Sequence, residues 1–573
     1  MIANTTLGET PDPGRSCEAI GTMASDERNA ADLFVECLEA EGVRYVFGIP
    51  GEETLDLNRA LADSSIEFVP VRHEQGGAYM ADMYGRLTHS AGVCLGTLGP
   101  GATNLVTGVA DAWLDRSPLV ALTGQGDLER THKESHQYID VVSLFKPITK
   151  WNTRLNSPNM IPEAVRKAFK VAQAQKPGPT HIELPEDVMA SAVEGRPLLH
   201  RQERRRPEPS QHELAQAAEL IAGAEHPLVL AGNGVSRGDA APALRAFAHA
   251  TGMGVAATFM GKGVLDDADP HWRGTVGMQA RDYELAGFDH ADVVITVGYD
   301  LVEHAPVNWN PKQNKLIVCI DTVSSEVDQH FVTAADLIGD IDLILRKLTA
   351  LVGTGEPSTT TPSKLEDLVQ GVFRAGAHDD AFPFHPPRVL WEIRQALGPS
   401  DILISDVGMH KLWIARMFPA HEPDTVLIAN GLAGMGIALP TAIAAKLVYP
   451  ERRVVTVSGD GGFLMNCQEL ETAKRLRTAV VNVIWENQQY GSIVWKQDNK
   501  FGRHFGVDFT NPDFVALAQA FGLPGFRCES VEDFARHLDR ALALDEPSII
   551  VVPIDYSQDI ALQDQLGKET VAA

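Results

Sequence analysis

One stretch of the sequence, residues 454–462, constrains the fold more than any other. Val454-Val455-Thr456-Val457 is a short apolar, β-branched run, which is typical of a buried strand. It leads into Ser458-Gly459-Asp460-Gly461-Gly462, where the backbone can turn sharply and its N–H groups can face an anion. A helix is predicted at 466–477 and a second buried strand at 479–485. Because parallel strands joined by a helix end at the same sheet edge, Asp460 and Asn487 are predicted to lie together at a ligand-binding edge.

The residue types at this edge indicate the chemistry. A carboxylate, an amide oxygen and a backbone carbonyl are hard ligands of the kind that Mg²⁺ prefers, and that ion commonly shares its shell with phosphates. The glycines leave room for such phosphates. A lone Gly-Asp-Gly also occurs in plain strand-to-helix turns, so the interval of some 25 residues before Asn487 is the informative part.

Glu74 is a second candidate functional residue. It follows an apolar strand predicted at 66–71 and lies in Arg72-His73-Glu74-Gln75-Gly76-Gly77, at the start of a helix. One interpretation is a carboxylate that the helix dipole stabilises at the N-terminus. The other is a carboxylate that hydrogen-bonds an azaheterocycle and shifts its tautomer.

The order of strands and helices along the chain predicts an α/β protein with three doubly wound parallel-sheet domains. The domains are expected at 28–190, 211–352 and 375–573, the last with a C-terminal tail. Residues 1–27 are interpreted as a disordered tail, and the charged or low-complexity segments 191–210 and 353–374 as linkers. The glycine turns of the middle domain lack a GxGxxG pattern, which favours a structural role over nucleotide binding.

Composition excludes several classes of partner. The formal net charge of −27 disfavours nucleic acid and anionic membranes. No apolar run approaches the length of a membrane span. The six cysteines are scattered, which fits reduced thiols and a cytoplasmic protein better than a disulfide framework.

Several motifs resemble one family over about 28–560. The interval from Gly-Asp-Gly to Asn487, the run 72–75, the run Gly99-Pro100-Gly101-Ala102-Thr103-Asn104, and the segments 145–150 and 178–179 resemble the thiamin-diphosphate-dependent acetolactate synthases. Segments 133–137, 298–310 and 405–410 look like the catabolic, FAD-independent branch, and the flavin-contacting arginine motifs of the biosynthetic branch are not evident. Two features depart from the catabolic branch, namely Asn487 where Asp is common and the run 431–436.

This resemblance implies thiamin diphosphate and Mg²⁺ as cofactors and the absence of FAD. Glu74 would be catalytic, bonded to the aminopyrimidine ring, and Met435 would support the bent cofactor. Asp460, Asn487 and the Gln489 carbonyl would bind the metal ion. The other cofactor-binding residues implied are Gly408, His410, Gly461, Gly462, Gly491 and Ser492. Gln137, Val494 and Trp495 would face the substrate, with ordinary core packing as the alternative for Trp495.

The implied reaction is decarboxylation of pyruvate and condensation of the resulting hydroxyethyl carbanion with a second 2-oxo acid to give acetolactate. In the family, the Glu and the diphosphate motif come from different subunits, so a homodimer at minimum, and a homotetramer, is expected. Three alternatives remain open at this point. They are another 2-oxo acid decarboxylase or acyloin-forming lyase, a flavin-containing oxidase, and a non-catalytic homologue.

Overall fold

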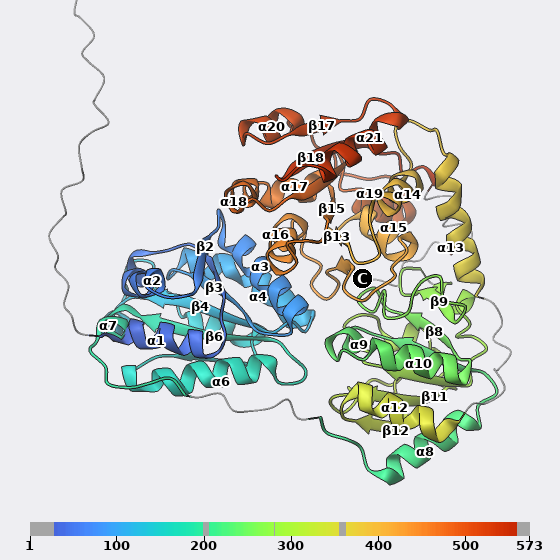
Figure 1. The fold of residues 1–573 in the computed structure, drawn as a ribbon, viewed down its shortest axis with the longest axis horizontal. Helices are drawn as coiled ribbons and strands as arrows, with labels where there is room; N and C mark the ends of the chain where they lie inside the picture. Colours follow the sequence, from blue (N-terminus) through green and yellow to red (C-terminus); the bar gives the residue numbers. More distant parts are fainter. Residues whose placement is uncertain (1–27, 199–205, 280, 354–362, 559–565, 567–573) are drawn as a thin grey trace, which may run out of the picture.

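The structure is a computed structural model that describes residues 28–198, 206–279, 281–353, 363–558 and 566. Three six-stranded sheets divide the chain into an N-terminal, a central and a C-terminal domain (Figure 1). All strand pairs within the three sheets are parallel. The predicted α/β fold of three parallel-sheet domains is therefore confirmed.

The N-terminal domain has the strand order β2-β1-β3-β4-β6-β5. Its middle strands are buried along their whole length, as expected for parallel strands covered on both faces. The strands are β1 Tyr45–Gly48, β2 Glu67–Pro70, β3 Gly92–Gly96, β4 Leu119–Gln125, β5 Trp151–Arg154 and β6 Pro179–Pro185. The helices are α1 Ala30–Ala40, α2 Leu55–Ala62, α3 Glu74–Thr88, α4 Pro100–Leu114, α5 Val141–Phe145, α6 Ile161–Gln173 and α7 Glu186–Ala190.

The C-terminal domain repeats this topology with the order β14-β13-β15-β16-β18-β17. Its strands are β13 Ile402–Ser405, β14 Val426–Ile428, β15 Val454–Gly459, β16 Val480–Glu486, β17 Gly525–Arg527 and β18 Ser548–Pro553. Its helices are α13 Lys364–Ala375, α14 Pro386–Ala396, α15 Met409–Met417, α16 Ala438–Val448, α17 Asp460–Asn466, α18 Glu469–Leu476, α19 Gly491–Phe501, α20 Phe514–Ala520 and α21 Val531–Leu542. The strand order reverses between β13 and β15, which is the place where open α/β sheets bind ligands.

The central domain has a different order, β12-β11-β10-β7-β8-β9. Numbered within the domain, this is the order 3-2-1-4-5-6 read in reverse, the arrangement of dinucleotide-binding folds. Its strands are β7 Pro227–Ala231, β8 Gly254–Ala257, β9 Trp272–Thr275, β10 Val293–Val297, β11 Leu316–Asp321 and β12 Thr333–Ile338. Its helices are α8 Gln211–Ala222, α9 Gly234–Arg237, α10 Ala241–Thr251, α11 Asp282–Leu285 and α12 Ile341–Val352.

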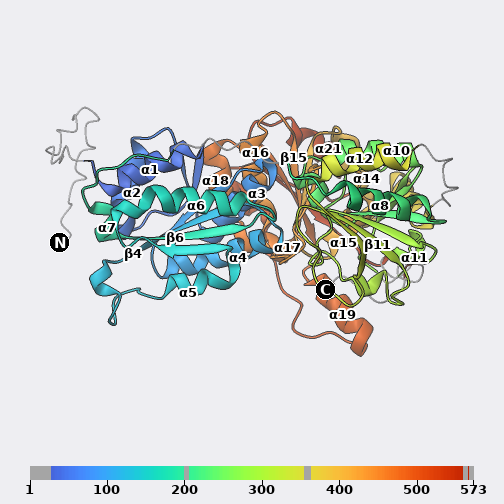
Figure 2. The ribbon, with the colours of Figure 1, turned by 90° about the horizontal axis from the view of Figure 1, so that it is seen from below.

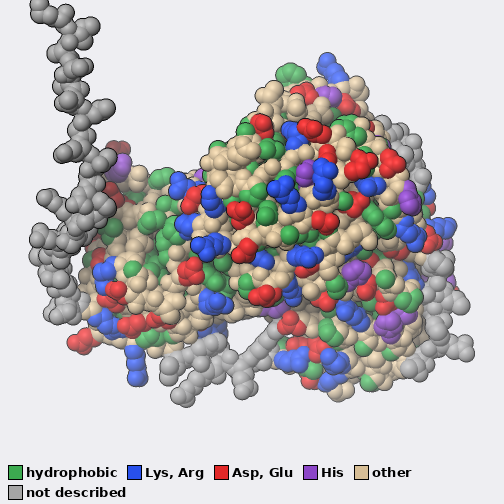
Figure 3. Space-filling model, turned by 45° about the horizontal axis from the view of Figure 1, so that its top comes forward, with side chains coloured by type: hydrophobic (Ala, Val, Ile, Leu, Met, Phe, Trp, Pro, Cys, Tyr) green, Lys and Arg blue, Asp and Glu red, His purple; other side chains and the backbone are tan. Residues whose placement is uncertain are grey.

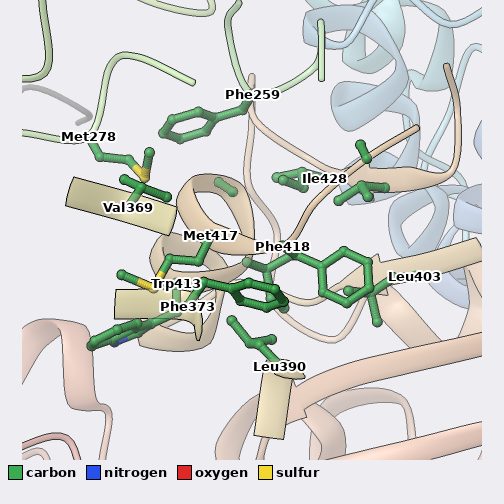
Figure 4. Close-up of a cluster of buried hydrophobic side chains, with 14 of the residues drawn as sticks. Phe259, Met278, Val369, Phe373, Leu390, Leu403, Trp413, Met417, Phe418 and Ile428 are labelled. Carbon is green, nitrogen blue, oxygen red and sulfur yellow. The ribbon is translucent and has the colours of Figure 1, made fainter. Parts of the chain in front are cut away.

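Continuous apolar packing joins the C-terminal domain to both of the others. Helix α16 packs on α3, and one buried cluster runs from the N-terminal into the C-terminal domain. A second cluster links the central and C-terminal domains, where Phe259 and Met278 lie near Val369 of α13 and Met417 of α15 (Figure 4). The C-terminal sheet is thus held between the two other domains.

Two local predictions differ from the structure. The helix expected at 466–477 is two helices, because α17 already begins at Asp460 and ends at Asn466, and α18 begins at Glu469. The second half of the predicted linker 353–374 is helix α13, which buries Leu365, Val369 and Phe373 at helical spacing. The predicted N-terminal tail, 1–27, lies outside the described residues, as do parts of both linkers and of the C-terminal tail.

Three further features are the length of the helices, the state of the cysteines and the distribution of surface charge. In the part of the chain that the structure describes, no helix is both long and apolar enough to cross a membrane. The five cysteines that are described are free, and four of them are buried. One face of the molecule shows acidic and basic side chains interspersed (Figure 3).

Candidate active site

Asp460 is the central residue of the candidate site. It follows β15, begins α17 and is 1% exposed. Its Oδ2 atom accepts hydrogen bonds from the backbone N–H of Asn487 at 3.0 Å and of Gln488 at 2.6 Å. The Asn511 amide also donates to Oδ2, at 2.9 Å, and the Gly461 N–H donates to Oδ1. Because β15 and β16 are parallel neighbours, this carboxylate fixes the segments that leave both strands.

A cavity of about 270 Å³ opens at the carboxyl ends of β13, β15 and β16. All ten residues that the sequence predicted to bind the cofactor line it: Gly408, His410, Met435, Asp460, Gly461, Gly462, Asn487, Gln489, Gly491 and Ser492. The structure thus brings together four sequence segments, the first and last of which contain Gly408 and Ser492, 84 positions apart. Seven further residues complete the lining, namely Val407, Met409, Gly459, Met465, Tyr490, Ile493 and Tyr556.

The cavity floor suits a phosphate-bearing group. A Cβ atom on Gly461 would lie 2.8 Å from the Tyr490 ring, and one on Gly491 would lie 3.1 Å from Met409, so side chains at these positions would fill the cradle. His410 is buried, and burial lowers its pKa to about 3, so the ring is neutral. Its Nε2 atom has no hydrogen-bond partner among the described residues. An unpartnered buried polar atom beside a glycine cradle fits a polar ligand.

Met435 lies in a segment that is held at its C-terminal end. The N–H of Gly436, whose φ is +84°, donates to Asp406 Oδ1 at 2.9 Å, and its carbonyl accepts from the Asn466 amide at 2.9 Å. Asp406 also accepts from the N–H of Val407, and burial raises its pKa to about 6. The carboxylate therefore ties the loop after β13 to the segment that carries Met435.

Glu74 lies at the first position of α3 in the N-terminal domain and is 6% exposed. Its Oε2 atom accepts a hydrogen bond from the Asn104 amide at 2.9 Å. A Cβ atom on Gly101 would approach Glu74 Oε1 to 3.3 Å, so the run 99–104 lies against this carboxylate. Glu74 does not belong to the lining of the cavity described above. The two halves of the predicted site are therefore separate within one chain.

The predicted substrate residues also fall outside that lining. Gln137 belongs to the N-terminal half, since a Cβ atom on Gly99 would lie 2.6 Å from its carbonyl oxygen. Val494 and Trp495 lie on α19, in the turn after Gly491, and both are partly exposed. The core interpretation of Trp495 does not hold in the single chain, because α19 contains no buried residue.

Two of the groups that the sequence did not predict are a hydrogen-bond donor to Asp460 and a residue that lines the cavity. Asn511 donates to the Asp460 carboxylate from a segment after α19, and nothing in the local sequence indicates this contact. Tyr556 lines the cavity from the segment that follows β18. A signal for Tyr556 did exist, since the end of a parallel strand places its next residues at the ligand edge.

Comparison with known proteins gives a consistent classification. Residues 28–144, 214–348 and 406–552 match the N-terminal TPP binding, central and C-terminal TPP binding domains of thiamine pyrophosphate enzymes. The chain is 35% identical to the acetolactate synthase of Bacillus subtilis, over 95% of this chain and 96% of that one. It is also 35% identical to the catabolic acetolactate synthase of Raoultella terrigena, over 94% and 97% of the two chains. A probable acetolactate synthase large subunit of Methanocaldococcus jannaschii is 34% identical, over 94% of each.

The fold, the cavity and these matches together define a thiamin-diphosphate enzyme. Within that class, the chain belongs to the acetolactate synthase family.

Proposed function

We propose that this protein is an acetolactate-forming carboligase that uses thiamin diphosphate and Mg²⁺. It takes pyruvate and a second 2-oxo acid as substrates. The observation that carries the proposal is the convergence of all ten predicted cofactor-binding residues on one cavity around Asp460. The names of the relatives support the choice of product.

The residues present fit both cofactors. Asp460, Asn487 and the backbone carbonyl of Gln489 would hold Mg²⁺. The Gln489 side chain is turned toward Asp508, to which its amide nitrogen donates at 2.7 Å. Gly491 and Ser492 begin the eleven-residue helix α19, where N–H groups suit an anion. His410 would donate to the same anion from Nε2. Met435, which lines the same cavity, would support the cofactor.

Bound thiamin diphosphate supplies the carbanion chemistry, and the protein supplies position and proton control. Glu74 would hold a proton at its carboxyl group against the aminopyrimidine ring, and Asn104 keeps that carboxyl in place. Val494, Trp495 and Gln137 would surround the reacting 2-oxo acids and limit the entry of water.

Assembly into at least a homodimer, and into a homotetramer, is part of the proposal. Glu74 lies outside the cavity of its own chain, so a complete site requires this carboxylate from a second copy. Helix α19 stands away from the body of the chain (Figure 2). Its last residue, Phe501, is 65% exposed, and Phe505 in the segment after it is 89% exposed. Apolar side chains exposed on and after a helix that begins at the cavity favour a protein interface there.

Absence of FAD is proposed for the central domain. The turns after β7 and β10 pack backbone against backbone, since a Cβ atom on Gly234 would lie 2.5 Å from Gly298 Cα. Asp300 at this edge is paired with Lys176 at 2.6 Å and with Arg237 at 2.8 Å. These ion pairs lie at the edge where open α/β sheets bind ligands, which supports a structural role for this edge. Absence of flavin absorbance in the purified protein checks this point.

The test of the proposal is turnover of pyruvate by purified protein with added thiamin diphosphate and Mg²⁺, with the products identified by NMR. Acetolactate is the expected product. Acetaldehyde alone would indicate a 2-oxo acid decarboxylase, and an acyloin formed from other substrates would indicate a lyase; either result would overturn the acetolactate assignment. Flavin-dependent oxygen consumption would indicate the oxidase alternative.

A further inference from the structure

Asn430 lies where the three domains meet. Its side-chain amide donates to the backbone carbonyl of Glu303 in the central domain at 3.1 Å. Its Oδ1 atom accepts from Lys411 Nζ on α15 of the C-terminal domain at 3.0 Å. Its backbone N–H faces the carboxylate of Asp115 in the N-terminal domain at 3.3 Å. One asparagine therefore contacts all three domains through three different groups.

Asp115 extends this junction. It caps the C-terminal end of α4, is buried, and accepts the N–H of Gly431 at 2.6 Å. Its own backbone carbonyl accepts from the Asn233 amide of the central domain at 3.2 Å. Arg86 of α3 donates to the carbonyl of Ile428 at 3.1 Å, just before the same segment. The N-terminal domain thus holds the chain on both sides of Asn430.

Two of the segments that meet at this junction also carry residues that line the cavity. Lys411 is the residue after His410, and Asn430 begins the segment 430–436 that contains Met435. Two glycines of this segment are closely packed against the N-terminal domain: a Cβ atom on Gly431 would lie 2.6 Å from Leu114 Cβ, and one on Gly434 would lie 2.3 Å from the Tyr79 hydroxyl. A displacement at Asn430 would therefore disturb these contacts and, through them, the position of Met435.

Because Lys411 is buried, its ammonium group depends on the hydrogen bond to Asn430. Its ammonium group lies over the Phe259 ring of the central domain, 5.6 Å from the centroid, and burial lowers its pKa to about 8. A buried ammonium that loses a hydrogen-bond acceptor must move or lose its proton, because an unsatisfied buried polar group costs free energy. Movement of the ammonium group would shift the start of α15, where His410 lies.

We propose that Asn430 is a positioning residue, through which the N-terminal and central domains set the distance between the His410 and Met435 walls of the cofactor cavity. The proposal rests on the proposed function, and it gives the central domain a part in cofactor binding. Asn430 itself is not a lining residue of the cavity.

The first test is Asn430→Leu, which removes both side-chain hydrogen bonds, to the Glu303 carbonyl and from Lys411, and keeps the backbone N–H that faces Asp115. We expect its Kd for thiamin diphosphate at fixed Mg²⁺ to rise by about 10-fold or more, in the range found when supporting partners of a bound group are lost. Asn430→Asp keeps an oxygen toward Lys411 but loses the donor to the Glu303 carbonyl. We expect a smaller rise for this variant, and it serves where the leucine variant does not fold.

Tyr449→Phe is the matched control. Tyr449 also joins the C-terminal to the N-terminal domain, through a 3.3 Å hydrogen bond from its hydroxyl to the Leu87 carbonyl, and it does not line the cavity. We expect the Kd of Tyr449→Phe for thiamin diphosphate to stay within about twofold of the wild-type value. The variant loses only one ordinary hydrogen bond, which lies away from the cavity. An equal rise in Tyr449→Phe and Asn430→Leu would overturn the proposal, because general domain docking would then explain both.

A second readout needs no cofactor. Amide hydrogen exchange of the apo protein should speed up in 430–436 and 408–411 for Asn430→Leu and not for Tyr449→Phe. Unchanged exchange together with unchanged Kd overturns the positioning role. If wild-type protein binds no thiamin diphosphate, the proposed function fails, and the exchange experiment still decides whether Asn430 orders these two segments.

Discussion

The Asp460 carboxylate accepts a hydrogen bond from the backbone N–H of Asn487 at 3.0 Å. The two residues are 27 positions apart in the sequence and come from neighbouring parallel strands. Their relative position is therefore set by the protein itself. Proposed metal ligands that are fixed in this way lose little conformational freedom when the ion binds.

Asp460→Asn should weaken the binding of Mg²⁺ and, with it, of thiamin diphosphate. The change removes the negative charge and leaves the N–H groups of Asn487 and Gln488 facing a neutral amide. We expect the Mg²⁺ concentration needed for half-maximal cofactor binding to rise by about 10- to 100-fold. Titration of Mg²⁺ at a fixed concentration of thiamin diphosphate measures this half-maximal Mg²⁺ concentration. Asp508→Asn, at an exposed carboxylate bonded to the Gln489 side chain, is the control and should change it little.

Glu74→Gln should retain less than about a tenth of wild-type turnover, because a proton-transferring side chain commonly contributes 10²- to 10⁴-fold. The Asn104 amide can still bond the new side chain, so the fold around it should persist. Steady-state rates at saturating thiamin diphosphate test the prediction. Glu67→Gln, at an exposed position of β2 in the same domain, should leave turnover unchanged. Turnover above a tenth in Glu74→Gln would remove this residue from the mechanism.

Much of the site could be predicted from short-range sequence signals. A β-branched run that ends in glycine predicts a strand ending at a ligand edge, and β15 and β16 match the predicted ranges within two residues at each end. The amphipathic signal for α13 was also present, with Ser363 as its N-cap and Leu365, Val369 and Phe373 on one face. The low complexity of the preceding segment hides this signal, because it extends the predicted linker into the helix.

Other features depend on contacts that no local pattern contains. Gly461 and Gly462 suggest a loop, yet they lie in the first turn of α17. Tyr490 and Phe509 occupy the space that a side chain at Gly461 would need, so close packing selects glycine inside a helix there. The separation of Glu74 from the cavity in one chain is likewise invisible to sequence periodicity, since it depends on how α3 docks on α16.

Mixing two inactive variants should restore activity if the site is shared between subunits. In a Glu74→Gln and Asp460→Asn mixture that is unfolded and refolded, or co-expressed, each mixed dimer carries one intact site. Random pairing then predicts about a quarter of wild-type turnover. Each variant treated alone is the control and should remain inactive. No recovery in mixtures, with mixed dimers verified by mass spectrometry, would place Glu74 and Asp460 of the same chain in one site.

Asp82→Asn should flatten the dependence of stability on pH. Asp82 on α3 is buried near Arg86, near Asp111 of α4 and near Asp115, which caps that helix. Its Oδ1 atom has no hydrogen-bond partner among the described residues. Burial, and then the nearby Asp115, raise its pKa from 3.8 to about 7. The pKa of Asp111 is raised as well, for the same reasons. The folded state therefore keeps a proton that the unfolded chain releases near pH 4.

The sign of the effect follows from this difference. The stabilising contribution of the protonated carboxyl is complete below about pH 4 and declines as the pH rises to about 7. Asparagine cannot ionise, so the variant should lose less stability than the wild type between these limits and should unfold at a higher temperature at pH 8. Thermal unfolding at several pH values measures it, with Asp63→Asn at an exposed position after α2 as the control. A variant whose unfolding temperature keeps the wild-type dependence on pH would show that Asp82 is ionised in the folded protein.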